Sequence, residues 1–448
     1  MISQKYPLIA AAVAATLAAG VANAAPPALS AAAAPVASLV IAGSSAAESS
    51  VQAAVGADIC GGATNMLTMK SAGGSGNFFA FSCTPSPAIS GVPAGVVTIY
   101  YRTEGGSVVG ALPVVSQAKI KRLNLSDSTC TASGTSGTCS ITGLTATAGT
   151  QDSWGQAVVA DFVQLGVTDV EPGQLGNSGD YPSGYNTTVF GTATAKQLAA
   201  LPTSKIFQQV FGIVINTTGG AFPSSASTAG VSLSKESIQN ILLRNYTDWS
   251  NVPSVGSVNA VAGAQTIVPI DREPGSGTRT ATNIFFLNYG CGGVVSIDSS
   301  QNTTALNFST TDELNLAEST QGAIAYTSID QILKNPAAFP NLVLANIDGV
   351  TPSNLAAATG AYDYWYEATF VTNTSQLSGA SASIATVLEN KLPVLANAPG
   401  SPDINVIPNY KGNIPAVPIT SSGTGTAEIY INPFTRGGNS CSIPAEQN

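Results

Sequence analysis

The sequence contains no histidine, and only 9% of its 448 residues are charged. Without histidine, the chain cannot build a Ser-His-Asp or Cys-His catalytic centre or a histidine-ligated metal site. Because average soluble proteins carry about 25% charged residues, this surface must be hydrated mainly by neutral polar side chains and by the backbone. Lys and Arg number 16 against 25 Asp and Glu. This shortage of basic residues excludes a general nucleic-acid binder, since phosphate contacts need clustered Lys and Arg.

The N-terminus has the pattern of a cleaved secretory signal. Lys5 supplies a positive charge, residues 8–21 form an apolar run, and Ala-Asn-Ala at 22–24 is a small-residue cleavage site. We expect residues 1–24 to be removed and an Ala/Pro linker to follow at 25–37. The mature net charge is then −10, from 15 basic and 25 acidic residues. The apolar run is too short to span a bilayer, and no cysteine near the cut could carry a lipid anchor. These features predict a periplasmic or extracellular protein.

Six cysteines agree with an oxidising compartment. Six cysteines allow fifteen pairings. The spacing favours a disulfide between the two cysteines that enclose a short Ser/Thr/Gly loop, and a second between the two cysteines nearest the N-terminus. The remaining two cysteines would then join the middle of the chain to its end. The predicted disulfides are therefore Cys130–Cys139, Cys60–Cys83 and Cys291–Cys441. The alternative is a metal or redox site, which the absence of any Cys-x-x-Cys pair disfavours. We expect neither a metal nor a cofactor.

The apolar pattern predicts a mixed α/β chain without an internal repeat. β-branched and aromatic runs predict strands at 39–41, 96–101, 162–167 and 211–215. Ser234 is a favourable N-cap, so we expect a helix to begin there. A further helix is expected to follow a glycine-rich loop near residue 275 and to stop at Gly290.

The most informative segment is the glycine-rich loop that follows Arg272, at the junction between an apolar strand and a helix. The backbone N–H groups of a first helical turn have no partner within the helix, and the helix dipole adds positive charge, so an anion fits there. Gly275 and Gly277 allow close backbone approach. Ser276 and Thr278 add hydroxyl donors, and Arg272 adds a two-pronged guanidinium contact. The alternative is an ordinary capped turn.

Residues 272–279, Arg-Glu-Pro-Gly-Ser-Gly-Thr-Arg, resemble the R-x-x-G-S-G-T signature of the phosphate-binding proteins of bacterial phosphate transporters, in the type II periplasmic-binding-protein superfamily. Other segments resemble that family in the same order along the chain: 41–46, 101–110, 162–169, 241–249 and 322–326. The resemblance covers most of residues 38–375 and is interrupted by insertions.

The resemblance implies a two-lobed α/β fold of the periplasmic-binding-protein type II, each lobe a mixed sheet flanked by helices. Lobe one would comprise 37–214 with 360–448 and lobe two 215–359, with hinge crossings near Ile215 and 364–372. The implied ligand is inorganic phosphate in the cleft between the lobes. The residues implied to bind it are Ser45, Ala46, Ser107, Asp169, Arg272, Ser276, Gly277 and Thr278.

Asp169 is unusual in an anion site, because a carboxylate repels a dianion. Its presence is explained if the ligand carries a proton, since hydrogen phosphate can donate to a carboxylate and sulfate cannot. The alternative is that Asp169 only caps a helix or closes a turn. Glu104 lies close to Ser107 in the sequence and would repel an anion unless its side chain points away.

These observations leave three functions open. The first is a secreted or periplasmic phosphate-binding protein for transport or scavenging; we expect a monomer, with a phosphate permease of the ABC type as its candidate partner. The second is a surface or structural interaction protein that reuses the fold, which the low charge and the Ser/Thr/Gly insertions favour. The third is an enzyme such as a phosphatase, which lacks a visible base or metal-carboxylate cluster. We therefore expect a binder and not a catalyst.

Overall fold

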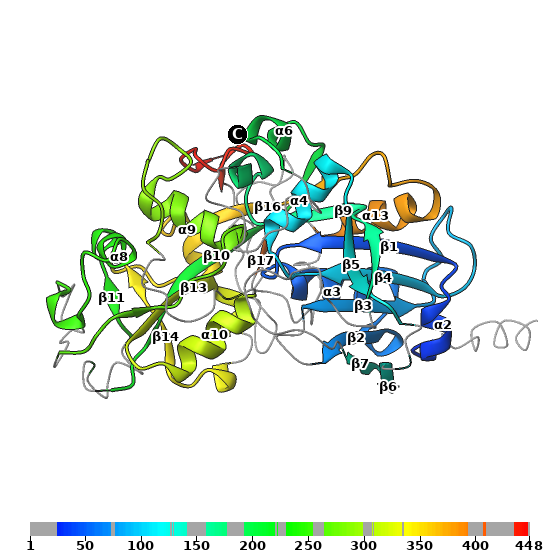
Figure 1. Ribbon diagram of the computed structural model, residues 1–448, viewed down its shortest axis with the longest axis horizontal. Coiled ribbons are helices and arrows are strands. Elements are labelled where there is room, and N and C mark those ends of the chain that lie inside the picture. Colours follow the sequence, from blue (N-terminus) through cyan, green and yellow to red (C-terminus); the bar gives the residue numbers. More distant parts are fainter. Residues whose placement is uncertain are drawn as a thin grey trace, which may run out of the picture.

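A computed structural model gives the fold of the chain (Figure 1). The residues it describes are 25–72, 77–125, 128, 130–140, 158–176, 192–219, 222, 230–253, 264–298, 307, 309–333, 336–392, 406–408 and 434–446. The predicted signal peptide at 1–24 lies outside them. Within these ranges, no helix has both the length and the hydrophobicity that a membrane crossing requires.

The molecule has two parts, which we call lobe one and lobe two (Figure 1). Lobe one begins with α2 (Leu29–Ala33), β1 (Ala37–Gly43), α3 (Glu48–Ala54), β2 (Leu67–Ala72), β3 (Phe78–Cys83), β4 (Val97–Arg102), α4 (Ser107–Ser116), β5 (Lys119–Leu123), β6 (Cys130–Ser133), β7 (Ser136–Ser140), β8 (Val158–Phe162), β9 (Leu165–Thr168) and α6 (Ala195–Ala199). The long strand β10 (Thr203–Asn216) then leads into lobe two.

Lobe two contains β11 (Ser232–Leu233), α8 (Lys235–Leu242), β12 (Val268–Pro269), α9 (Gly277–Leu287), α10 (Thr310–Ser319), β13 (Ala323–Ser328), α11 (Ile329–Leu333), β14 (Leu342–Leu344), β15 (Asn346–Ile347) and α12 (Asn354–Ala358). The chain returns to lobe one through β16 (Trp365–Thr372), α13 (Gly379–Lys391), β17 (Val406–Pro408), β18 (Phe434–Thr435) and β19 (Ala445–Glu446).

One mixed sheet connects the lobes. Its strand order is β12-β13-β10-β16-β9-β1-β4-β3-β2-β7-β6, and β14 and β17 also pair with β10. Strand β10 changes partner along its length: residues up to Val210 pair with β16, whereas Phe211 to Ile215 pair with β13. This change of pairing partner lies a few residues before the hinge crossing predicted near Ile215. The boundaries of the two lobes stay a prediction.

Alternating side chains place helices on both faces of the sheet. Leu39 and Ile41 of β1 join the core beneath α3 and α13, whereas Val40 belongs to a separate core on the opposite face. In lobe two, Tyr326 of β13 packs with α8 and α9, whereas Ala325 packs with α10. This period-two alternation under helical layers confirms the α/β class.

Two predicted segments differ from the structure. The segment 25–37, predicted as a linker, contains helix α2, and Ala32 is fully buried against the neighbouring strands. Residues 162–167, predicted as one strand, belong to two strands, because β8 ends at Phe162 and β9 begins at Leu165. Both errors arise from packing that no local pattern records.

Helix α9 also ends earlier than predicted. It stops at Leu287, and Asn288 adopts the left-handed conformation with a φ of 53°. Asparagine tolerates this conformation better than other side chains do. The predicted stop at Gly290 is therefore two residues too late, because Asn288 terminates the helix first.

All three predicted disulfides are confirmed: Cys60–Cys83, Cys130–Cys139 and Cys291–Cys441. The last joins the loop after α9 in lobe two to the C-terminal segment, which lies above β16 in Figure 1. In that segment Ser440 exchanges two hydrogen bonds with Glu171 of lobe one, at 2.9 and 3.3 Å. The C-terminal segment thus connects the lobes a second time.

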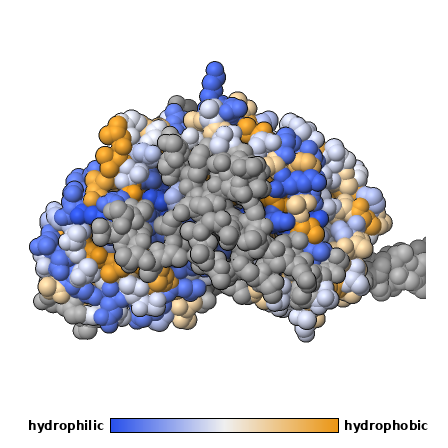
Figure 2. Space-filling model, in the orientation of Figure 1, coloured by the Kyte–Doolittle hydropathy of each residue, from blue (hydrophilic) through white to orange (hydrophobic). Residues whose placement is uncertain are grey.

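The surface agrees with the scarcity of charge. Figure 2 shows hydrophilic and hydrophobic residues interspersed over the described surface of one face. Two of the most exposed large apolar side chains are Val294, at 90%, and Ile443, at 86%, and each lies close in sequence to a cysteine of the Cys291–Cys441 disulfide.

Close packing of α4 on the sheet gives a test of this fold. A Cβ at Gly110 would lie 2.7 Å from the Ala42 carbonyl oxygen and 2.8 Å from that of Val167. We expect Gly110→Ala to lower the free energy of unfolding by about 1–3 kcal/mol, since the helix must move away from the sheet. Urea denaturation measures this change.

The control is Gly56→Ala, in the helical turn Val55–Ile59, where a Cβ would meet its nearest atom at an ordinary 3.5 Å. That substitution should be neutral or stabilising, because alanine is the better helix former. An equal loss of stability in both variants would contradict the packing described for α4.

Candidate functional site

Three strands of lobe one end at a common edge of the sheet. β1 runs parallel to both β4 and β9, and the carboxyl ends of parallel strands meet at the same edge. Ser44 and Ser45 follow β1, Ser107 begins the helix after β4, and Asp169 follows β9. The structure therefore brings the predicted lobe-one residues together, although they are widely separated in the sequence.

The loop after β1 turns sharply at Gly43. Its φ is +133°, and a Cβ there would lie 1.9 Å from the Val167 carbonyl oxygen, so only glycine fits. The turn directs the two following serines to different partners. Ser44 Oγ donates to Asp169 Oδ1, whereas Ser45 Oγ accepts from Nη2 of Arg272 in lobe two at 3.3 Å. Ala46 follows in the same loop.

Lobe two contributes the loop between β12 and α9. Ser276 is the N-cap of α9, and its Oγ accepts from the backbone N–H of Arg279 at 3.3 Å. The N–H groups of Gly277 and Thr278 lie in the first turn and have no partner within the helix. The helix dipole makes this end positive. The sequence interpretation of this helix start as an anion-binding site stays a prediction.

The lobes touch each other at this loop. Val108 N–H, in the first turn of α4, donates to the Gly275 carbonyl at 3.0 Å. A Cβ at Gly277 would lie 2.1 Å from Ser107 Oγ and 2.7 Å from Asp169 Oδ2. The backbone of lobe two therefore lies directly against the side chains of lobe one, and Gly277 is the residue that allows it.

Asp169 is held by groups from both lobes. It is 2% exposed and accepts from Ser44 Oγ of lobe one and, at 3.4 Å, from Thr278 Oγ1 of lobe two. Its own backbone N–H donates to Ser107 Oγ at 3.1 Å. Burial raises the pKa of the Asp169 carboxyl, and the Ser44 hydrogen bond and the Arg272 charge act against that rise. These side-chain partners differ from those of a simple helix or turn cap.

Arg272 carries the positive charge of the site. It is 1% exposed. Its Nε donates to the Asn307 carbonyl at 3.1 Å, Nη1 to Thr310 Oγ1 at 3.0 Å and Nη2 to Ser45 Oγ at 3.3 Å. The guanidinium therefore connects the start of α10 in lobe two with the β1 loop in lobe one.

The negative charges of the acidic side chains near the site are offset. Glu104 forms a 3.0 Å ion pair with Arg102, and both side chains are buried. Burial raises the pKa of the Glu273 carboxyl well above its usual range, and repulsion by Glu104 adds to the rise. The site is thus less negative than the sequence alone suggests, which answers the concern about Glu104 beside Ser107.

Sequence reasoning missed two residues of this cluster, Ser44 and Thr310. Ser44 stands next to the predicted Ser45, and only the turn at Gly43 decides which of the two hydroxyls meets Asp169. Thr310 follows Arg272 by 38 residues, and no spacing rule connects them. Thr310 lies within a Ser-x-x-Asp pattern at 309–312, a capping box that marks the start of α10, and this pattern is the signal that could have drawn attention to the segment.

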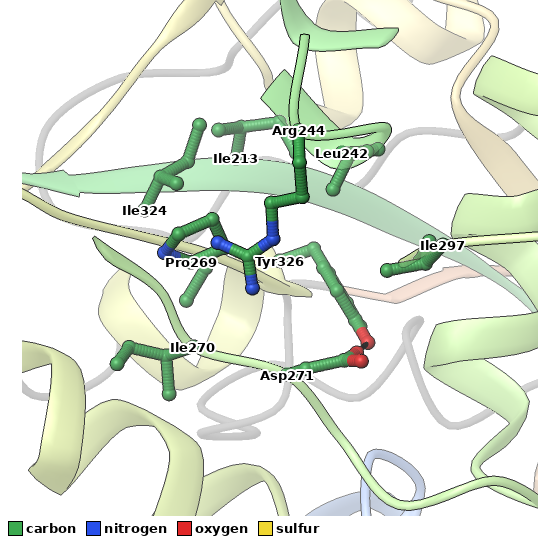
Figure 3. A pocket seen from close by; sticks show the side chains of 10 residues that line it. Ile213, Leu242, Arg244, Pro269, Ile270, Asp271, Ile297, Ile324 and Tyr326 are labelled. Carbon is green, nitrogen blue, oxygen red and sulfur yellow. Dashed lines mark hydrogen bonds between the residues drawn. The ribbon is translucent and has the colours of Figure 1, made fainter. Parts of the chain in front are cut away.

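A separate small pocket lies in lobe two (Figure 3). Its lining is mostly apolar, and the Arg244 side chain reaches into it. Asp271 and Tyr326 also line it, and the Tyr326 hydroxyl donates to Asp271 and accepts from Arg272 N–H at 3.1 Å. None of the phosphate-binding residues implied by the sequence lines this pocket. Over the described ranges, no group of three or more Cys, Asp or Glu side chains is arranged to hold a metal ion.

One family model matches the middle of the chain. Residues 206–389 match the family model described as a PBP superfamily domain. The resemblance to periplasmic binding proteins is thereby confirmed over this segment. A comparison with curated proteins finds no match.

Several solved structures are similar to this chain at low identity. One is a putative phosphate ABC transporter substrate-binding protein with bound phosphate from Clostridium perfringens, at 15% identity over 78% of this chain and 92% of that chain, with a TM-score of 0.43. A phosphate-binding protein from Stenotrophomonas maltophilia has 14% identity over 80% and 84%, with a TM-score of 0.40. A possible phosphate binding protein from Planctomyces limnophilus has 12% identity over 83% and 92%, with a TM-score of 0.36.

The buried carboxyls at and beside the site predict how stability depends on pH. Burial raises the pKa of Asp169, Glu273 and Glu313. A carboxyl whose pKa rises on folding stabilises fully below its unfolded pKa and loses that contribution as the pH rises through the folded pKa. We therefore expect the free energy of unfolding, measured in urea at constant ionic strength, to fall as the pH rises above about 4, the ordinary pKa of these carboxyls.

Glu313→Gln isolates one of these groups. The amide oxygen can still accept the Tyr326 N–H, which Glu313 Oε1 accepts at 3.1 Å, but the side chain no longer titrates. The decline of stability with pH should therefore be shallower in this variant. An identical decline in both proteins would show that Glu313 does not titrate in this range.

Proposed function

We propose that this protein is a solute-binding protein that captures inorganic phosphate between its lobes, for transport or scavenging, and that it is not an enzyme. The observation that carries the proposal is the burial of Arg272 from lobe two and Asp169 from lobe one where the two lobes meet. Hydroxyl groups and the N-terminus of α9 surround that contact. A guanidinium, hydroxyl donors and free N–H groups together suit a tetrahedral oxyanion.

Asp169 selects the protonation state of the ligand. A carboxylate among anion-binding donors is tolerable when the ligand brings a proton of its own, which hydrogen phosphate does and sulfate does not. Because burial raises the pKa of Asp169, the side chain gains a proton more readily as the pH falls. Sulfate should therefore compete better in acid, since the protonated carboxyl no longer repels it.

Ligand entry requires the lobes to separate. The predicted phosphate ligands come from both lobes, and β10 and β16 connect the lobes. A hinge movement at these strands would open the site and close it again around the anion. The disulfides support a periplasmic or extracellular location. A phosphate permease remains the candidate partner, and the monomeric state remains a prediction.

The test is a competition titration of ligand-stripped protein with phosphate and sulfate, in the wild type and in Asp169→Asn. We expect the wild type to bind phosphate and to reject sulfate. The variant should lose roughly 2–4 kcal/mol of this selectivity, because an amide can donate where the carboxylate only accepts. Asp161→Asn, on β8 and partly exposed, is the matched control.

Equal sulfate rejection by the wild type and Asp169→Asn would mean that Asp169 has only a structural role. A wild type that prefers sulfate would overturn the assignment of phosphate. A wild type that binds no oxyanion would favour the surface-protein alternative, and turnover of a phosphate ester would favour an enzyme.

Arg272→Ala is expected to weaken phosphate binding by about 2–5 kcal/mol, because the anion loses a charge-assisted partner in a buried site. Isothermal calorimetry measures the loss. The matched control is Arg122→Ala, which removes a partly exposed guanidinium paired with Asp161 at 3.0 Å. An unchanged affinity in Arg272→Ala would place the anion elsewhere.

A further inference from the structure

The Arg272 guanidinium is held on two sides by one segment of lobe two. Nε donates to the Asn307 carbonyl at 3.1 Å, and Nη1 donates to Thr310 Oγ1 at 3.0 Å. Asn307 is itself fixed, since its Nδ2 donates to the Asp271 carbonyl at 2.8 Å and its carbonyl accepts the Glu273 N–H at 3.1 Å. The arginine and the start of α10 therefore form one hydrogen-bonded unit.

These contacts decide how the guanidinium is oriented toward a ligand. A guanidinium has five N–H groups in a planar fork. Because Nε is engaged by Asn307, the side-on pair of Nε and Nη2 cannot receive an oxyanion. At the Nη end, Nη2 reaches Ser45 Oγ at 3.3 Å, so this end faces the β1 loop of lobe one. The hydrogen bond from Nη1 to Thr310 Oγ1 sets the orientation of the guanidinium plane.

Thr310 is well placed to set that orientation. It is 1% exposed and is the first residue of α10, directly after the N-cap Ser309. Ser309 and Asp312 form a capping box, with Ser309 N–H donating to Asp312 at 3.2 Å and Asp312 N–H donating to Ser309 Oγ at 3.2 Å. The backbone at Thr310 is therefore rigid, and its N–H donates to Ser45 Oγ at 3.3 Å.

The chemistry of a hydroxyl suits this role. A neutral acceptor orients a guanidinium without adding a negative charge that would compete with an anionic ligand. A carboxylate at the same position would form an ion pair and compete with the ligand. The nearest acidic residue that the same helix face offers, Glu313, instead accepts the Tyr326 N–H at 3.1 Å.

We propose that Thr310 is a positioning residue of the anion site, whose hydroxyl fixes the plane of the Arg272 guanidinium so that the Nη end faces the bound phosphate. This inference rests on the proposed function. It adds to the site a residue from α10, an element outside the three loops and the α9 start that the sequence predicted.

The test compares Thr310→Val with Thr310→Ser, using inorganic phosphate and isothermal calorimetry. Valine keeps the shape but removes the acceptor, so we expect affinity to fall roughly tenfold, as for the loss of one hydrogen bond to a charged group. Serine keeps the acceptor and should bind nearly as well as the wild type. Thr311→Val, at the exposed neighbouring position, controls for the effect of valine on the helix.

A double-mutant cycle with Arg272→Lys separates positioning from general stability. A lysine ammonium has no plane for Thr310 to orient, so Thr310→Val should cost less than about twofold in that background. A merely structural role would give the same loss in both backgrounds. Thermal unfolding midpoints of all variants show whether each protein remains folded.

Equal affinities of Thr310→Val and Thr310→Ser, or an equal loss in the Arg272→Lys background, would overturn the inference while leaving the proposed function intact. A wild type that binds no phosphate would overturn the proposed function, and this inference with it.

Discussion

The Asp169 carboxyl in lobe one and the Arg272 guanidinium in lobe two are buried where the lobes meet. Burying either group is costly unless it is hydrogen-bonded, and the structure supplies each with partners from both lobes. Ser44 and Thr278 donate to the carboxyl, and Ser45 accepts from the guanidinium. The turns after β1, β4 and β9 and the start of α9 supply these hydrogen-bonding partners.

Glycine makes the arrangement sterically feasible. Gly43 lets the β1 loop turn against β9, and Gly110 lets α4 lie close to the sheet, which places Ser107 beside Asp169. Gly277 brings the lobe-two backbone against both of those side chains. The lobes are connected through β10 and β16, and again through the C-terminal segment and its disulfide to Cys291. Any opening of the site must therefore be accommodated by all of these connections.

Much of the site could be predicted from the sequence, because its signals are local. Glycine and hydroxyl spacing marked the Arg272 loop, and the resemblance of strand ends located Ser107 and Asp169. Residues that depend on distant contacts could not be predicted in this way. Whether Ser44 or Ser45 meets Asp169 depends on a single turn. Thr310 reaches Arg272 only after the lobe has folded. The disulfides were predictable from spacing, whereas the packing of α2 within the predicted linker was not.

A crystal structure of the protein grown with phosphate tests the account most directly. We predict a tetrahedral anion in contact with the Nη end of Arg272, the first-turn N–H groups of α9 and the Asp169 carboxyl. In that structure Nε of Arg272 should still donate to Asn307 and Nη1 to Thr310. An anion bound elsewhere, or an Arg272–Ser45 contact left unchanged with no anion beside it, would contradict the account.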